Sequence, residues 1–324
     1  MKNLRFICAQ PSTMYYAWQV EVMINNFIEM GVNPNFIDVV STKKSGFISD
    51  EWLKLCEHFN NVRFFFYEDL RENKNYISSI RPNILKQHFK KNPYLKDEII
   101  FYHDCDILLT KPIDEWICCA MYSDDNWYGS DCRWYIGHDY ILSKGNDILA
   151  KMCDIIGIKK EVIKENELNS IGAQYLMKGI THYFWDKVEK DSEILFKEIT
   201  ELNDEKIIED RRTMPPGEER TPYHPLQIWC ADMWAVLWNG WKMGYKTIPS
   251  SKFNFTWATG TKTEFEKNNI FHNAGIVNGD INRFYKGKYT DKLPYGDELN
   301  IIEDSASLEY WKYIQSVGKK SVLI

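Results

Sequence analysis

Short apolar segments alternate with amphipathic segments over the first hundred residues, and this alternation most constrains the fold. The apolar segments predict strands, and the segments between them carry apolar side chains at helical spacing. The predicted strands are Leu4–Ala9, Asn35–Val40, Val62–Tyr67 and Glu98–Tyr102, and the predicted helices are Tyr15–Met30, Asp50–Phe59 and Pro82–Lys90. Because this alternation is typical of a mostly parallel sheet flanked by helices, we expect an α/β fold.

The pattern changes after residue 125, and the prediction there is more mixed. We expect strands at Trp127–Ser130 and Tyr135–Tyr140, and helices at Asp147–Ile156, Ala173–Met177 and Leu226–Trp241. The acidic stretch 161–210 predicts solvated helices, and the Pro- and Arg-rich stretch 211–225 predicts a loop. That loop is either a linker or a mobile lid.

Composition and the absence of certain sequence motifs argue against several classes of protein. The chain is 44% hydrophobic and 27% charged, as in ordinary globular proteins, and its net charge of −6 offers no overall basic surface. No glycine-rich dinucleotide or P-loop motif follows a predicted strand. The 8 cysteines lack metal or redox spacing, and no apolar run is long enough to span a bilayer. We therefore expect a cytoplasmic protein without a membrane partner, in the host cytoplasm if it is viral.

Two carboxylates one residue apart, Asp104 and Asp106, follow the fourth predicted strand. Alternate residues of a strand share a face, so both side chains are expected to point the same way at the carboxyl end of that strand. Ligands of open α/β sheets bind at this edge. Paired carboxylates there suit Mg²⁺ or Mn²⁺ held together with substrate phosphates. The alternative is a surface turn that uses aspartate for its turn chemistry.

Three later residues are candidates to complete such a site. His272, in Ile-Phe-His-Asn-Ala-Gly, is either a third metal ligand or a hydrogen-bonded structural histidine. Gln174 follows small residues at an expected helix start, where its amide could form hydrogen bonds with the hydroxyl groups of a ligand. Asp232 lies in an aromatic helix, and a lone carboxylate there is either buried at a cost or faces a site.

These motifs, in this order, resemble those of GT-A type nucleotide-sugar glycosyltransferases over about residues 1–280. In that family an Asp-x-Asp motif ends a central strand of a Rossmann-like sheet and holds Mn²⁺ or Mg²⁺ against a nucleoside diphosphate, and a later histidine often completes the metal shell. Asp104, Asp106 and His272 match that pattern. The chain is also similar to hydroxyproline arabinosyl- and serine galactosyltransferases, and to phage enzymes that glycosylate hydroxymethylated DNA bases.

The resemblance implies a donor-binding half and an acceptor-binding half. The donor half is expected at 1–125, the acceptor and catalytic half at 126–295, and a helical tail at 296–324. A nucleoside diphosphate sugar, expected to be a UDP-sugar, is the implied donor. The residues expected to bind it are Gln10, Ser12, Tyr15, Arg81, Lys86 and His103. Arg81 and Lys86 would neutralise the diphosphate, unless they form a solvated helix face.

The resemblance also implies roles on the acceptor side. Asp232 would orient or deprotonate the acceptor hydroxyl, with Asp131 as a second candidate, and Gln174 would touch the sugar. Retention of configuration is expected from the resemblance alone. The locally basic and aromatic stretch 242–294 favours DNA with modified bases as the acceptor, and the alternative is a polypeptide or glycan.

Two readings outside this family stay open. A metal-dependent phosphohydrolase or nuclease also uses paired carboxylates, but it usually gathers more Asp, Glu and His ligands. A carbohydrate-binding module would explain the 15% aromatic content, but not a charged pair after a strand.

Overall fold

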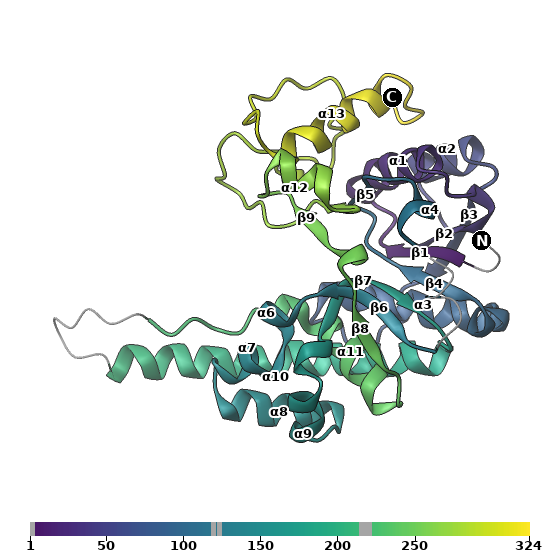
Figure 1. Ribbon diagram of the computed structural model, residues 1–324. Coiled ribbons are helices and arrows are strands. Elements are labelled where there is room, and N and C mark those ends of the chain that lie inside the picture. The colour runs from purple at the N-terminus through teal and green to yellow at the C-terminus, as the bar shows by residue number, and fades with distance from the viewer. Residues whose placement is uncertain (1–3, 118–120, 122–124, 214–221) are drawn as a thin grey trace.

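A seven-stranded sheet forms the centre of the computed structural model, which describes residues 4–117, 121, 125–213 and 222–324 (Figure 1). Its strand order is β3-β2-β1-β4-β7-β6-β8, and the strands from β3 to β4 are all parallel. β7 runs antiparallel to both of its neighbours. The strands are β1 (Leu4–Gln10), β2 (Ile37–Lys43), β3 (Arg63–Glu68), β4 (Ile99–Tyr102), β6 (Trp127–Asp131), β7 (Ile171–Met177) and β8 (Thr247–Pro249). The predicted α/β fold with a mostly parallel sheet is therefore confirmed.

A smaller three-stranded sheet connects this centre to the carboxyl-terminal part of the chain. Its order is β5-β10-β9, with β10 antiparallel to β5 and parallel to β9. The strands are β5 (Ile107–Leu109), β9 (Phe255–Trp257) and β10 (Ile270–His272). Because β5 follows β4 after a short turn, the small sheet begins at the carboxyl end of a central strand.

Helices cover both faces of the large sheet. One apolar cluster packs α1 and α2 against one face and extends to α13, which contacts α1. Another packs α3, α10 and α11 against the other face, with α8 packed on α10 (Figure 1). These are α1 (Met14–Glu29), α2 (Asp50–His58), α3 (Ile80–Lys91), α8 (Asn146–Ile156), α10 (His182–Thr213), α11 (Ala231–Lys242) and α13 (Ala306–Gly318). The shorter helices are α4 (Ile113–Trp116), α6 (Arg133–Ile136), α7 (His138–Leu142), α9 (Lys160–Glu165) and α12 (Lys262–Lys267).

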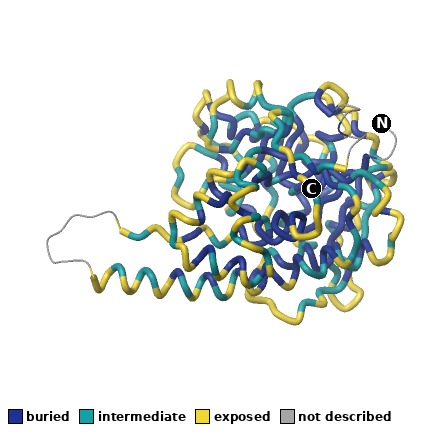
Figure 2. The backbone as a smooth tube through the Cα atoms, turned by 60° about the horizontal axis from the view of Figure 1, so that its bottom comes forward, coloured by how far each residue is buried: buried dark blue, intermediate teal, exposed yellow. Residues whose placement is uncertain are grey.

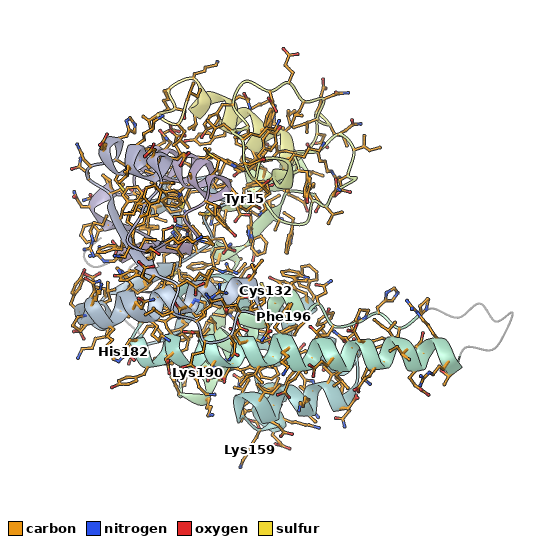
Figure 3. All side chains as sticks on the ribbon, turned by 180° about the vertical axis from the view of Figure 1, so that it is seen from behind. Tyr15, Cys132, Lys159, His182, Lys190 and Phe196 are labelled. Atoms are coloured by element: carbon orange, nitrogen blue, oxygen red, sulfur yellow. The ribbon has the colours of Figure 1, made fainter. Side chains whose placement is uncertain are left out.

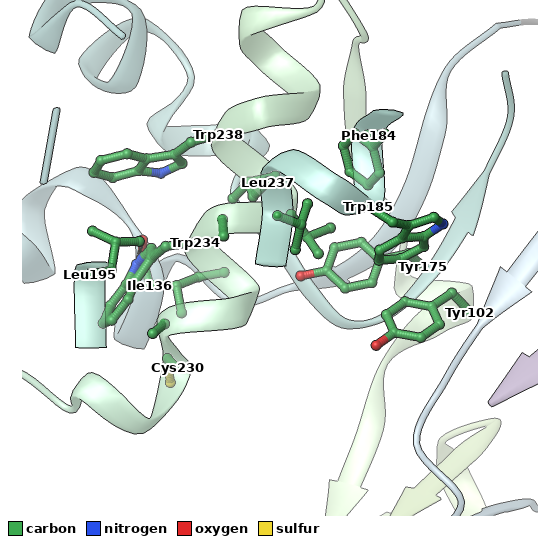
Figure 4. Packing of buried hydrophobic residues seen from close by; sticks show 14 of the residues in the cluster. Tyr102, Ile136, Tyr175, Phe184, Trp185, Leu195, Cys230, Trp234, Leu237 and Trp238 are labelled. Carbon is green, nitrogen blue, oxygen red and sulfur yellow. Dashed lines mark hydrogen bonds between the residues drawn. The ribbon is translucent and has the colours of Figure 1, made fainter. Parts of the chain in front are cut away.

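Burial in the core explains why the apolar segments in the first half of the chain form strands. All seven residues of β1 are buried, as expected for a parallel strand that lies between two others and under helices on both faces. The tryptophans of α11, including Trp234 and Trp238, are buried in the second cluster beside Leu195 of α10 (Figure 4). The far end of α10 extends away from this core and is largely exposed (Figure 2).

Two predicted elements are wrong. The predicted helix Ala173–Met177 is part of β7, because pairing with β4 and β6 in the sheet outweighs the helix propensity of Ala, Gln, Leu and Met. The predicted strand Tyr135–Tyr140 is instead the two short helices α6 and α7, separated at Gly137.

The acidic stretch is partly as expected. α10 is long and largely solvated, but one side of it packs into the core through Phe184, Trp185 and Leu195. In the predicted loop 211–225, residues 211–213 belong to α10, while 214–221 lie outside the described residues. None of the described helices combines the length and apolar character needed to cross a bilayer.

A buried ion pair at the amino end of the sheet gives a test of this architecture. Asp38 of β2 is fully buried and lies 3.1 Å from Nη1 of Arg5 in β1 and 3.1 Å from Nε of Arg63 in β3. Asp38→Ala removes one carboxylate partner of Arg5 and of Arg63, while Arg5 keeps its ion pair with Glu98, so we expect the free energy of unfolding to fall by about 1–3 kcal/mol in urea denaturation.

The matched control is Lys190→Ala, which removes an exposed ion pair with Asp186 on α10 (Lys190 is labelled in Figure 3). Its expected cost is about 0–1 kcal/mol. Equal stability of the two variants would contradict the role assigned to Asp38.

Candidate active site

The two aspartates lie in the connection between the two sheets. β4 ends at Tyr102 and β5 begins at Ile107, so Asp104 and Asp106 are in the intervening turn and not on the strand itself. This corrects the expectation that strand alternation aims them. Their position at the carboxyl end of a parallel strand is the one predicted.

His272 reaches the aspartates through the pairing of β10 with β5. His272 is the register partner of Ile107, and the backbone N–H of Asn273 donates to the carbonyl of Asp106 at 2.9 Å. His272 Nε2 then lies 3.4 Å from Asp104 Oδ2 and 3.4 Å from Asp106 Oδ1. The ligand atoms of the three residues lie within 4.8 Å of one another, a spacing that one ion could bridge.

Two cations neutralise these carboxylates. Arg81 of α3 forms an ion pair with Asp104 and, at 2.7 Å, with Asp232 of α11. Lys286, in the 3₁₀ turn η7 (Lys286–Lys288), forms an ion pair with Asp106. Each aspartate of the pair therefore faces one cation.

The pKa values follow from this arrangement. Burial opposes ionisation of Asp104 and Asp106, but the charge of Arg81 outweighs it at Asp104 and that of Lys286 at Asp106, so both carboxyl pKa values are lowered. Burial also disfavours a charged His272, yet Asp106 and Asp104 outweigh it and raise the His272 pKa to about 9. At neutral pH this imidazole is therefore protonated.

Gln174 lies behind His272 and acts on its other nitrogen. The Gln174 side chain is fully buried in β7, and its Nε2 lies 3.4 Å from His272 Nδ1. A protonated imidazole donates from both nitrogens, so an oxygen suits this place better than an amide nitrogen. A 180° turn of the amide exchanges Nε2 with Oε1, which has no partner among the described residues. The Gln174 oxygen then accepts a hydrogen bond from His272 Nδ1, and His272 Nε2 is left to bind an ion.

The three clustered side chains fit a divalent ion. They offer two carboxylate oxygens and one imidazole nitrogen at one point. Carboxylates suit Mg²⁺ and Mn²⁺, and imidazole is a more common ligand of transition metals than of Mg²⁺.

A cavity of about 220 Å³ opens beside this cluster. Gln10 from the end of β1, Tyr15 from α1 and Arg81 line it together with the cluster and Lys286. Tyr15 lies where the amino-terminal helices face the carboxyl-terminal layer (Figure 3).

A second, inner chamber of about 80 Å³ adjoins the cavity, and both are lined by Arg81, Asp104 and His272. Asp232, Tyr175 and Trp257 also line this chamber. Tyr175 stacks beside Tyr102, with ring centroids 6.3 Å apart (Figure 4).

Asp232 and Asp131 lie in different places. Asp232 faces the inner chamber, where Tyr76 OH donates to it at 2.6 Å beside the Arg81 ion pair. Asp131, at the end of β6, is paired with Arg133 at 3.2 Å and lines neither the cavity nor the chamber.

Three predicted donor-binding residues lie elsewhere. Lys86 forms ion pairs with Glu189 at 2.6 Å and Asp186 at 3.3 Å, so it holds α3 against α10. His103 is buried against Phe101 and Phe27, and burial lowers its pKa to about 4. Ser12 contacts Thr42 of β2 and does not line the cavity.

Sequence reasoning missed Lys286 and Tyr76. Lys286 stands in a stretch with several lysines, and nothing in that pattern singles it out. Tyr76 precedes a predicted helix in a polar stretch without a motif. Both enter the site only through tertiary contacts.

No family model matches the sequence, and the search of curated proteins also gives no match. Solved structures with a similar arrangement include the bifunctional glycosyltransferase WbbM, at 8% identity and a TM-score of 0.48 over 99% of this chain. The chain spans about half the length of that protein, 52%.

The galactosyltransferase LgtC, solved with donor and acceptor sugar analogues, aligns with 97% of this chain and 95% of its own length, at 12% identity and a TM-score of 0.43. A glycosyltransferase involved in glycosylation of the PBCV-1 major capsid aligns with 84% of this chain and 94% of its own length, at 11% identity and a TM-score of 0.38. Because these scores lie below 0.5, we assign chemistry from the residues of the site alone.

The raised pKa of His272 predicts how ion binding depends on pH. An ion takes the neutral imidazole, so it must displace a proton from His272 at any pH below about 9. We expect the affinity for Mn²⁺ to rise about tenfold per pH unit between roughly pH 6 and pH 8, measured by isothermal titration calorimetry.

His272→Ala is the control, because without the imidazole this pH dependence should largely disappear. An affinity for Mn²⁺ that is the same across this range in the unmodified protein would show that His272 is not a ligand.

Proposed function

We propose that this chain is a metal-dependent glycosyltransferase that moves a sugar from a nucleoside diphosphate sugar to an acceptor hydroxyl. One observation carries the proposal: the cluster of Asp104, Asp106 and His272 shares one cavity with two cations, Arg81 and Lys286. The cluster is a ligand set for a divalent ion, and the cations are partners for phosphate oxygens.

The ion pairs of the free protein support a diphosphate as the ligand. Arg81 and Lys286 now pair with the carboxylates that an ion would bind. A divalent ion at these carboxylates would replace the two cations as their counter-charge. Arg81 and Lys286 would then be free to form ion pairs with the phosphate oxygens of a diphosphate in the same cavity.

Each side chain then has a defined task. Asp104, Asp106 and His272 would hold Mn²⁺ or Mg²⁺, which supplies charge stabilisation for the leaving diphosphate when bound. Lys286 and Arg81 would bind phosphate oxygens and stabilise the negative charge that develops as the sugar departs. Gln174 is a positioning residue, because it touches His272 and does not line the cavity.

The end of β1 supports a nucleoside in this cavity. Gln10 lines the cavity and is buried, and its Nε2 donates to the Val40 carbonyl at 3.3 Å. Its Oε1 has no hydrogen-bond partner among the described residues. Uracil and guanine both offer an N–H donor of the kind this oxygen lacks, and Tyr15 and Tyr16 line the same cavity with aromatic rings. We propose a UDP-sugar as the donor from the family resemblance.

Asp232 is the proposed catalytic group on the acceptor side. It faces the inner chamber beside Arg81. Once Arg81 turns to the diphosphate, Asp232 becomes free to accept a hydrogen bond or proton from an acceptor hydroxyl. Retention of configuration stays an expectation from the family resemblance.

DNA with modified bases stays an alternative acceptor, proposed from the basic stretch 242–294. In the structure several of these cations already have partners within the protein. Lys242 donates to the Ile156 carbonyl, Lys286 pairs with Asp106, and Lys292 pairs with Asp297. A phosphohydrolase or nuclease is less favoured, because among the described residues only one cluster of three potential metal ligands is found.

Nucleotide binding provides the first test. UDP and Mn²⁺ together should raise the melting temperature by several degrees, and each alone should raise it less, because ion and diphosphate share one cavity. GDP serves as the comparison for base selectivity. Absence of any shift with UDP or GDP plus Mn²⁺ would refute a UDP- or GDP-sugar as the donor.

Transfer activity provides the second test. Asp106→Asn keeps the shape of the side chain but removes its charge, and we expect the rate of sugar transfer or donor hydrolysis to fall by about a hundredfold or more. Asp154→Asn on the exposed side of α8 is the matched control and should keep full activity. A folded Asp106→Asn protein with full activity would refute the proposed metal site.

A further inference from the structure

An open groove lies next to the inner chamber and shares one of its walls. This groove, of about 450 Å³, is lined by Asp131, Arg133, Trp134, Asn254, Trp257 and Asn268 among others. We call it the outer groove. Trp257 also lines the inner chamber, and its ring lies nearly parallel to that of His272, with centroids 6.1 Å apart. The Trp257 ring would therefore lie between a ligand in the outer groove and His272 of the proposed ion site.

Two tryptophans form an aromatic corner in this groove. Trp134 on α6 is 63% exposed, and its ring lies 6.0 Å from that of Trp257 at 70°. An indole this exposed gains little from the core, whereas it offers a large apolar face to a ligand. The corner presents one apolar surface from Trp134 and one from Trp257.

Polar groups surround the corner. Asp131 and Arg133 pair with each other at 3.2 Å, so they add no net charge to the groove. Asn254 lines the groove with a side-chain amide, which can both donate and accept hydrogen bonds. Asn268 uses its Nδ2 to donate to Thr256 at 2.9 Å, which leaves its oxygen for another donor. The groove thus combines aromatic faces with neutral hydrogen-bonding groups.

We propose that the outer groove binds a saccharide, so that the acceptor of this enzyme is a glycan. A pyranose ring has a face of C–H groups that packs on an aromatic ring, and hydroxyls at its rim that bond to amides and carboxylates. The outer groove supplies both kinds of contact. This inference rests on the proposed function, because it names the acceptor of the same site.

The charge of the groove distinguishes this acceptor from DNA. Affinity for nucleic acid depends on Lys and Arg side chains that neutralise phosphates. The one arginine of the outer groove is already paired with Asp131, and the tryptophans and asparagines that line it are neutral. A neutral saccharide therefore fits the groove better than a polyanion.

The test measures binding of defined probes to the full chain in the presence of UDP and Mn²⁺. The probes are an array of defined glycans, a DNA duplex with 5-hydroxymethylcytosine, and a peptide that contains serine and hydroxyproline. We expect glycans to bind, and Trp134→Ala to weaken that binding by about tenfold or more. Trp134→Phe, which keeps an aromatic face, should retain most of it.

The matched control is Tyr183→Ala, which removes another exposed aromatic residue at the start of α10. It should leave glycan affinity unchanged. The inference is overturned if only the duplex or only the peptide binds, if no glycan binds, or if Trp134→Ala has no effect.

Nucleotide binding separates failure of this inference from failure of the proposed function. Stabilisation by UDP and Mn²⁺ without glycan binding would remove the glycan acceptor and leave the sugar-nucleotide enzyme. Glycan binding that depends on Trp134 without any nucleotide binding would leave a saccharide site and refute the transferase.

Discussion

The antiparallel pairing of β5 with β10 is the contact on which the site depends. It places His272 opposite Ile107 and so beside Asp104 and Asp106, which are far away in the sequence. β5 in turn follows the central strand β4 after one short turn. The small sheet therefore joins the edge of the parallel sheet, where ligands bind in such folds, to the carboxyl-terminal part of the chain.

Charge balance connects the parts of this site. Arg81 comes from a helix of the amino-terminal half and Lys286 from the carboxyl-terminal layer, and they neutralise neighbouring carboxylates. Arg81 also pairs with Asp232, so one guanidinium links the proposed ion site to the proposed catalytic carboxylate. Because buried charges are costly unless they are paired, a ligand that changes one of these pairs must also change the others.

The sequence predicted most of the secondary structure in the first half of the chain and less of it in the second half. The apolar runs of β1 and β4 are short, buried and bounded by polar residues, so their strand character is local. β7 contains the helix-favouring residues Ala, Gln, Leu and Met, and its place between β4 and β6 makes it a strand. His103 and Lys86 were expected to bind the donor. Their side chains instead point into the core and toward α10.

By itself, the sequence determined the alternating α/β pattern and the position of Asp104 and Asp106 after a strand, because both depend on neighbouring residues. Tertiary structure decided which distant side chains meet that pair. Selection of Lys286 among several lysines, the placement of Gln174 behind His272, and the contact of Trp134 with Trp257 all follow from how strands and layers pack. The physical reason is that hydrogen bonds, ion pairs and stacking act over a few ångströms in space, at any separation along the chain.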